Sequence, residues 1–305
     1  MKKLFFLRFY LVSLKFFRGI HCSRIDEAIV ILSLIFIIAL GYLITFTFPY
    51  LSSQSSLFNV DAKSEYISIS PFEKARYPDW KLENVTVYDG CGGNSEILVG
   101  VLSINSVTTI ELERIEKNDL SVTLNTPNFE STAKITSNAG LEKDLSDCAT
   151  LVFDTSNQSY IFPIDGNVTL GHQISENSMR PPVLKNGTVY VADKRILAED
   201  YYQNTPFELR MGDRFIVRDA QTQASGFIFV DHQGDIDISY RVKGREGVVQ
   251  KYKSEPIIVE NNFWSKLVND DLLAIFWLFI WALFGIIKSL LFLKYDVIKV
   301  GRNNE

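Results

Sequence analysis

Hydrophobic residues follow two patterns along the chain: two long, almost uncharged blocks near its ends, and short alternating stretches between them. Residues 28–60 contain no charged side chain, and residues 272–293 contain only Lys288. A helix that crosses a bilayer needs about 20 mainly apolar residues. The two blocks therefore predict transmembrane helices at residues 28–48 and 272–293.

Positive charges flank both blocks on the sides that face away from the central segment. They are Lys2, Lys3, Arg8, Lys15, Arg18 and Arg24 before the first block, and Lys294, Lys299 and Arg302 after the second. Positive flanks are retained in the cytoplasm during insertion. We therefore expect an integral protein of a bacterial inner membrane, with both termini cytoplasmic, residues 51–271 extracytoplasmic and residues 294–305 a short tail.

The first 27 residues mix basic side chains with aromatic clusters. A helix of this composition is typical of segments that lie on an anionic membrane surface. The residues expected to contact the lipid headgroups are Lys2, Lys3, Arg8, Lys15 and Arg18. The alternative is an unstructured basic lead that only orients the first helix.

The central segment, residues 51–271, alternates apolar and polar residues with a period of two. In residues 235–243, one face carries Ile236, Ile238, Tyr240 and Val242, and the other carries polar side chains. This is the pattern of a half-buried strand. Similar runs occur at residues 66–70, 85–88, 97–102, 107–111, 120–124, 150–153, 188–192, 214–218, 226–230, 248–252 and 257–260. They predict a mainly β domain, an antiparallel sandwich or barrel, with a possible subdivision near residues 163–171.

Composition narrows the classes of function. The formal net charge is −5 and the acidic excess falls in the central segment, which argues against a nucleic-acid partner. Three cysteines are too few for a disulfide-dense scaffold or a multi-cysteine metal site. Cys91 and Cys148 both lie in the segment expected outside the cytoplasm, so we predict a disulfide between them; two unpaired cysteines are the alternative.

Metal and cofactor sites have little support in the sequence. His172 and His232 each lack a second ligand at helical or hairpin spacing, which makes a zinc site improbable. Asp231, Asp235 and Asp237 surround a glycine, as in a calcium loop, but no acid stands at the position of the bidentate ligand. We expect solvated turn acids, no metal and no cofactor. Four Asn-x-Ser/Thr sites leave glycosylation open, at Asn84, Asn157, Asn167 and Asn186.

Residues 177–181 read Asn-Ser-Met-Arg-Pro, and residues 184–194, 212–217 and 240–247 follow with Gly-Asp and Arg-Val-Lys-Gly motifs. In this order they resemble the boxes of type I signal peptidases. The resemblance implies that Ser178 is a nucleophile and that a desolvated lysine is its base. Tyr240 stands where that lysine is expected, and Lys243 is nearby on the polar face of the strand. The resemblance therefore implies a peptidase that is inactive or altered.

The leading functional prediction is a non-enzymatic sensor, binding or assembly subunit of a membrane complex. Its partners would be the lipid bilayer and another membrane or cytoplasmic protein, or a second copy of itself. The first alternative is the signal-peptidase-like enzyme that uses Ser178. The second is a homo-oligomer that regulates an envelope polymer, an arrangement that two flanking membrane helices would permit.

Overall fold

The computed structural model divides the chain into two compact units, residues 1–52 with 267–305 and residues 53–266. The structure describes residues 24–42, 45, 55–72, 77–93, 95–116, 119–127, 130–172, 183–195, 200–231, 235–251, 254–261, 265 and 268–302. Ser178 and the predicted membrane-surface residues Lys2, Lys3, Arg8, Lys15 and Arg18 lie outside these described residues.

Within its described residues, the first unit contains two helices, α2 (Arg24–Tyr42) and α5 (Asp271–Arg302). Both helices consist largely of Leu, Ile, Phe and Ala, and Asp271 in the first turn of α5 complements the helix dipole. They contact each other through aromatic rings. The centroids of Phe36 and Phe284 are 6.2 Å apart, and those of Tyr42 and Phe276 are 6.4 Å apart.

The prediction of membrane-crossing helices at residues 28–48 and 272–293 is wrong. Among the described residues, no helix combines the length and apolar character that a membrane crossing requires. The uncharged part of α2, residues 28–42, rises about 22 Å, and that of α5 before Lys288 rises about 24 Å, against roughly 30 Å of hydrocarbon. The predicted inner-membrane localisation, with cytoplasmic termini and an extracytoplasmic centre, depends on these two helices and is therefore not supported either.

The second unit is built from antiparallel strands, which confirms the predicted β domain. In the described part of the chain it has 18 strands. Their bounds are β1 (Ser56–Ser64), β2 (Tyr66–Ser70), β3 (Trp80–Asp89), β4 (Ser95–Ile104), β5 (Thr109–Glu116), β6 (Asp119–Asn125), β7 (Ala133–Ser137), β8 (Glu142–Asp144), β9 (Cys148–Asp154), β10 (Tyr160–Leu170), β11 (Leu184–Lys194), β12 (Tyr201–Gln203), β13 (Phe207–Leu209), β14 (Arg214–Arg218), β15 (Ala224–Val230), β16 (Ile236–Gly244), β17 (Glu246–Gln250) and β18 (Ile257–Val259).

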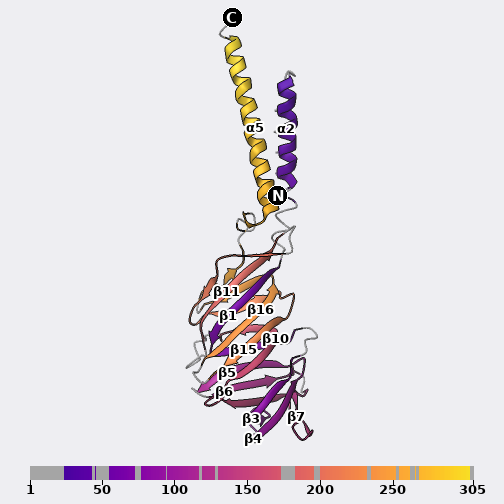
Figure 1. Cartoon of the computed structure of the whole chain (residues 1–305), viewed down its shortest axis with the longest axis vertical. Helices are drawn as coiled ribbons and strands as arrows, with labels where there is room; N and C mark the ends of the chain where they lie inside the picture. Colours follow the sequence, from indigo (N-terminus) through magenta and orange to yellow (C-terminus); the bar gives the residue numbers. More distant parts are fainter. Residues whose placement is uncertain are drawn as a thin grey trace. The chain divides into compact units, whose positions relative to one another are not determined.

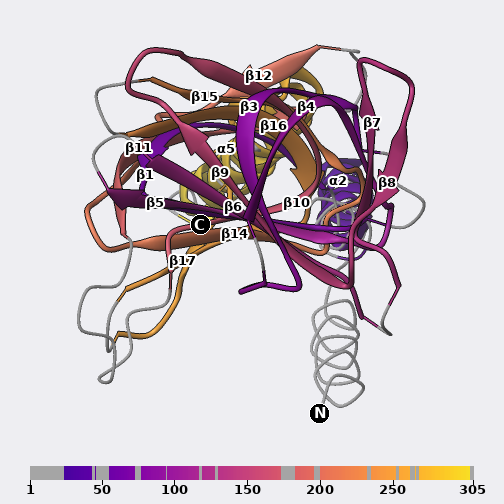
Figure 2. The same ribbon diagram turned by 90° about the horizontal axis from the view of Figure 1, so that it is seen from below.

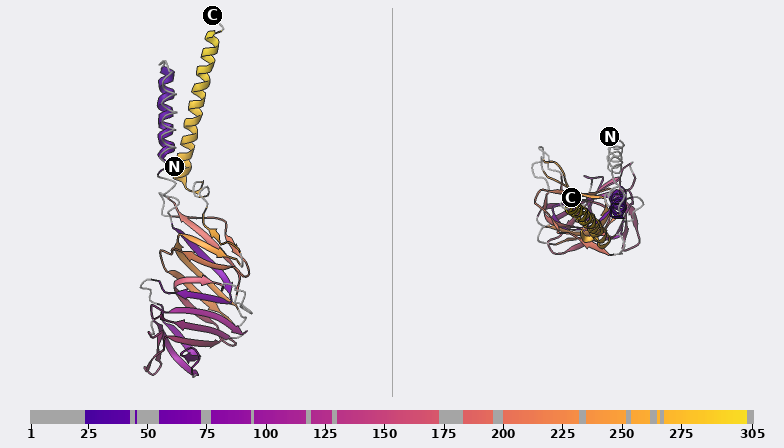
Figure 3. Two further views of the ribbon diagram at one scale, coloured as in Figure 1. Left: turned by 180° about the vertical axis from the view of Figure 1, so that it is seen from behind. Right: turned by 90° about the horizontal axis from the view of Figure 1, so that it is seen from above.

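The strands form two connected groups. In the first, β1 lies between β11 and β16, and β16 continues to β15 and then β10. In the second, β2, β5, β6, β9, β3, β4, β7 and β8 follow one another as neighbours. Figure 2 looks onto the β3–β4 end of this second group, and Figure 3 shows the strands from behind.

One strand, β10, belongs to both groups. Its first part, up to Gly166, pairs with β15, and the part from Asn167 onwards pairs with β2 and β14. Gly166 has a φ of 149°, and a Cβ there would lie 2.6 Å from the backbone oxygen of Ser70. Glycine is therefore needed where the strand passes from one group of strands to the other.

The core forms because each strand buries alternate residues. Phe58, Val60 and Ala62 of β1 point inward, as do Ile238 and Tyr240 of β16. Four rings from β3, β9 and the first part of β10 pack in edge-to-face or tilted contacts, a favourable geometry for aromatic pairs: Trp80 with Phe162 at 4.6 Å, and Phe153 with Phe162 and Tyr160 at 5.2 and 5.1 Å.

The predicted disulfide between Cys91 and Cys148 is present, with the two Cα atoms 5.4 Å apart. It joins the turn after β3 to the start of β9, two strands that already pair at Asp89 and Ala149. Asp89 accepts hydrogen bonds from the backbone N–H and the hydroxyl of Ser146. Burial opposes ionisation of Asp89, but these hydrogen bonds outweigh it and hold the pKa of that carboxyl below its ordinary value.

Candidate functional site

The outer face of β1, β15 and β16 is hollowed into a groove made of two adjoining parts. One part has a volume of about 530 Å³ and the other about 760 Å³, and both are lined by Asp61, Phe227 and Ser239. Small-molecule sites in proteins usually enclose about 300 to 1,000 Å³. We call this continuous surface the β1–β16 groove, and we treat it as the candidate site.

Strand alternation explains which side chains line the groove. Because Phe58, Val60 and Ala62 of β1 face the core, the residues between them face outward, and these are Leu57, Asn59, Asp61 and Lys63. On β16 the same alternation turns Asp237, Ser239, Arg241 and Lys243 away from the core. The groove floor is thus a regular array of polar side chains on a rigid sheet.

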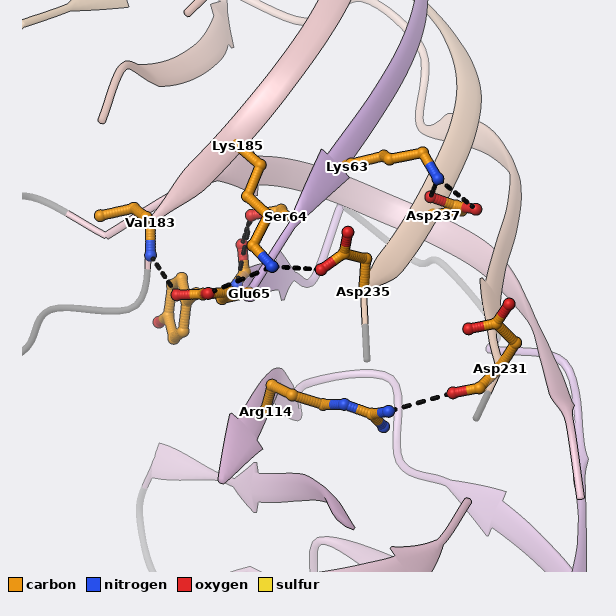
Figure 4. Close-up of polar contacts among 10 residues, drawn as sticks. Lys63, Ser64, Glu65, Arg114, Val183, Lys185, Asp231, Asp235 and Asp237 are labelled. Carbon is orange, nitrogen blue, oxygen red and sulfur yellow. Dashed lines mark hydrogen bonds and ion pairs between the residues drawn. The ribbon is translucent and has the colours of Figure 1, made fainter. Parts of the chain in front are cut away.

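The register of β1 and β16 places these polar residues directly opposite one another as Asn59 with Arg241, Asp61 with Ser239, and Lys63 with Asp237. Each of the three positions forms a cross-strand contact. Arg241 Nε donates to Asn59 Oδ1 at 2.7 Å, and Ser239 Oγ donates to Asp61 Oδ1 at 2.5 Å. Lys63 Nζ lies 3.2 Å from Asp237 Oδ1, an ion pair that Figure 4 shows.

Phe227 supplies an apolar surface at the point where the two parts of the groove meet. Its side chain is 51% exposed, which is unusual for a large aromatic residue in the middle of a sheet. The preceding residue, Gly226, permits close approach of β16, because a Cβ there would lie 2.1 Å from the backbone oxygen of Ser239. Phe227 itself pairs with Ser239, so its ring stands beside the polar row of β16.

The charges in the groove balance. Three of the lining residues are acidic, Asp61, Glu208 and Asp237. Three are basic, and they are Lys63, Arg241 and Lys243. The lining residues consequently have a formal net charge of zero, in contrast to the acidic chain as a whole.

Basic side chains from other strands contact Asp231, which follows β15, and Asp235, which precedes β16 (Figure 4). Arg114 of β5 donates to the backbone oxygen of Asp231 at 3.0 Å. Lys185 of β11 forms an ion pair with Asp235 and lies 3.4 Å from Glu65 Oε1. The hydrogen bond to Asp235 raises the pKa of Lys185, whereas burial lowers the pKa of Arg114.

Two of the three acids that resemble a calcium loop, Asp235 and Asp237, form ion pairs with lysines. The carboxylates of Asp235 and Asp237 face lysine side chains, so the local negative charge is already compensated within the protein. In the described residues, no three His, Cys, Asp or Glu side chains are grouped so that they could hold a metal ion.

A second polar cluster, buried in the β unit, lies around Asp193 at the end of β11. Ser56 at the start of β1, Tyr202 of β12 and Asn261 near the end of the unit all donate to this carboxylate, at 2.5, 3.3 and 2.8 Å. Asp193 is only 1% exposed. The cluster ties the first and last segments of the unit together, and its burial makes it a structural element.

Tyr240 and Lys243, two of the residues in the motifs that resemble signal peptidases, lie in the described part of the chain. Tyr240 is 4% exposed and faces the core, and burial raises the pKa of its hydroxyl above the ordinary value for tyrosine. A phenol in this state stays protonated and cannot serve as the base that the family's lysine provides. Lys243 lies on the opposite face and lines the groove. Ser178 is outside the described residues, so its position relative to either residue is not defined.

The groove was missed in the sequence because β1 was not predicted as a strand. The available signal was the alternation of Phe58, Val60 and Ala62 with polar residues, at the end of the uncharged stretch of residues 28–60. Comparison with protein families, curated proteins and solved structures finds no match to this chain.

Proposed function

We propose that the β unit is a non-enzymatic binding module and that the β1–β16 groove holds its ligand. The observation that carries the proposal is the continuous hollow of two parts joined at Asp61, Phe227 and Ser239. It combines an exposed ring with fixed polar groups, the combination typical of ligand sites. This retains the binding part of the function predicted from the sequence.

Recognition in this groove would depend on side chains alone. Residues 57–63 of β1 pair with β11 on one side and with β16 on the other. The backbone N–H and C=O groups of β1 are therefore used within the sheet, and a ligand strand cannot be added there. Specificity would come from the polar row and from Phe227.

The polar side chains are held in place before a ligand arrives. Asn59, Asp61 and Lys63 each contact the residue opposite on β16. Such contacts restrict side-chain rotation, so less conformational entropy is lost on binding. A groove built in this way favours recognition of a shape and a hydrogen-bonding pattern.

The chemistry of the groove favours binding over catalysis. Ser239 is a hydroxyl next to a carboxylate, but its partner Asp61 is exposed to solvent. A solvated carboxylate is too weak a base to deprotonate a serine, and nucleophilic serines are activated by an imidazole or a desolvated lysine. Among the residues that the structure describes, no histidine lines either part of the groove.

The proposal is tested by mapping where small ligands bind to the full-length protein. Transverse-relaxation-optimised amide spectra would be recorded during titration with a library of polar fragments. We expect the shifts to cluster on Asp61, Phe227 and Ser239 and their neighbours. Binding fragments whose shifts all lie outside β1, β15 and β16, or a library with no binding fragment, would refute the proposal.

A further inference from the structure

We infer that the ligand of the β1–β16 groove is a neutral, hydroxyl-rich chain, that is, an uncharged oligosaccharide. This inference rests on the proposed binding function and specifies its ligand class. Four features of the groove lead to it: charge balance, polar geometry, the exposed ring and length.

Charge balance disfavours a charged polymer. The two parts of the groove differ in charge: one is lined by the acids Asp61, Glu208 and Asp237 with Lys63 as its single base, and the other by Asp61 with the bases Arg241 and Lys243. A polyanion would meet Asp61 and Asp237, and a polycation would meet Arg241 and Lys243. Contact between like charges weakens binding, so a polyanion and a polycation would each lose affinity in one part of the groove. A neutral ligand has no such repulsion in either part.

The polar groups match hydroxyls, which both donate and accept hydrogen bonds. Asp61 offers carboxylate oxygens, Asn59 an amide and Arg241 a planar guanidinium. The contact of Arg241 with Asn59 uses Nε, and the terminal N–H groups of the guanidinium are separate donors. Adjacent hydroxyls of a sugar ring present a donor and an acceptor side by side, and planar side chains of this kind can bind both.

Phe227 matches the other surface of a sugar. One face of a pyranose ring is rich in C–H groups, whose partial positive charge is attracted to the negative face of an aromatic ring. Phe227 lines both parts of the groove and is half exposed. A sugar unit stacked on this ring would have polar groups of β16 and β1 at its edge, because Phe227 pairs with Ser239, and Ser239 pairs with Asp61.

The length of the groove favours a chain over a single sugar. The groove follows β1 from Leu57 to Lys63, which corresponds to about 20 Å of extended strand. Its two parts lie on either side of the shared residues Asp61, Phe227 and Ser239. A chain ligand would fill both parts and stack its central unit on Phe227.

The test is isothermal titration calorimetry of the full-length protein with five neutral hexasaccharides: cellohexaose, maltohexaose, chitohexaose, laminarihexaose and mannohexaose. Hexagalacturonate and a hexalysine peptide serve as charged comparisons. We expect at least one neutral hexasaccharide to bind at least tenfold more tightly than either charged oligomer. The expected effect of Phe227→Ala is a tenfold or larger increase in Kd, with recovery in Phe227→Trp.

The matched control is Ile97→Ala, because Ile97 is 69% exposed on β4 and lies outside the groove lining. It should leave Kd unchanged. If no neutral hexasaccharide binds, or if Phe227→Ala and Ile97→Ala have equal effects, the inference is wrong. If charged oligomers or other fragments still shift the amide resonances of groove residues, the proposed binding function stands and only the inference of a neutral oligosaccharide fails. If no compound shifts those resonances, the binding function and the inference both fail.

Discussion

Arg241 of β16 and Asn59 of β1 lie opposite each other, and Arg241 Nε donates a hydrogen bond to Asn59 Oδ1 at 2.7 Å. The two residues are 182 positions apart in the sequence. They form the first of three cross-strand contacts that end at Lys63 and Asp237. This row fixes the polar side chains of the groove on the sheet, and its consequences can be measured.

Arg241→Gln tests the contribution of the guanidinium to binding. The site is on the surface, so we expect the free energy of unfolding to change by no more than about 0.5 kcal/mol. The Kd for the tightest-binding neutral hexasaccharide should rise about tenfold, since a charge-assisted donor is lost. The control Lys81→Gln removes a cation from β3, outside the groove lining, and should leave Kd unchanged.

Asp193→Asn tests the buried cluster. The substitution places an amide N–H₂ group among the donors Ser56, Tyr202 and Asn261, so at least one buried donor loses its acceptor. We expect the free energy of unfolding to fall by about 2 to 3 kcal/mol, measured by urea denaturation. Asp200→Asn is the control, because the Asp200 side chain is 58% exposed. Equal effects of the two substitutions would show that the buried cluster has no special role.

Replacing both Cys91 and Cys148 by serine tests the disulfide. The bond closes a loop with a sequence separation of 57, and removal of such a bond costs about 2 to 4 kcal/mol in the free energy of unfolding. We expect a value near 2 kcal/mol, because hydrogen bonds between β3 and β9 hold the same segments together. The measurement is urea denaturation of both proteins without reductant. An unchanged urea midpoint would contradict the prediction.

Acid sensitivity should depend on Asp89. Its pKa is lower in the folded protein than in the unfolded chain, so its contribution to stability is fully present above about pH 4 and is lost as the pH falls through the folded-state pKa. Ser146→Ala removes the hydroxyl that donates to Asp89. We expect the variant to lose about 1 kcal/mol at pH 7.

The difference between the wild type and Ser146→Ala should shrink when denaturation is repeated at pH values below 4. Ser156→Ala provides the control, because Ser156 donates to Asp154 in the same way at an exposed site. Its effect at pH 7 should be smaller. A difference between the wild type and Ser146→Ala that does not vary with pH would rule out this role for Asp89.

Much of the β unit could be predicted from local alternation. Residues 66–70 and 214–218 match β2 and β14 in their bounds. In such strands one face is buried and the other is not, so the sequence itself records the period of two. A subdivision is predicted near residues 163–171 because tighter hairpin signals follow this range, whereas β10 runs through most of it as a single strand from Tyr160 to Leu170. Gly166, with a φ of 149°, lies where β10 changes its pairing partner from β15 to β2.

The groove could not be predicted in the same way. Asp61 and Ser239 are 178 positions apart, and nothing local specifies that β1 pairs with β16 in this register. For the helices α2 and α5, by contrast, the sequence predicts more than the structure shows. Their apolar composition predicts helices and both segments are helical, but the described helix α2 extends only to Tyr42, and Lys288 interrupts the uncharged run of α5. Composition over a long block overestimated the apolar length of each helix.

The most direct test of the account is a crystal structure of the full-length protein with its tightest-binding neutral hexasaccharide. The account predicts that the sugar lies along β1 and β16, with one ring stacked on Phe227 and hydroxyls hydrogen-bonded to Asp61 and Arg241. A hexasaccharide bound elsewhere, with Phe227 uncovered, would contradict the assignment of the groove as the binding site.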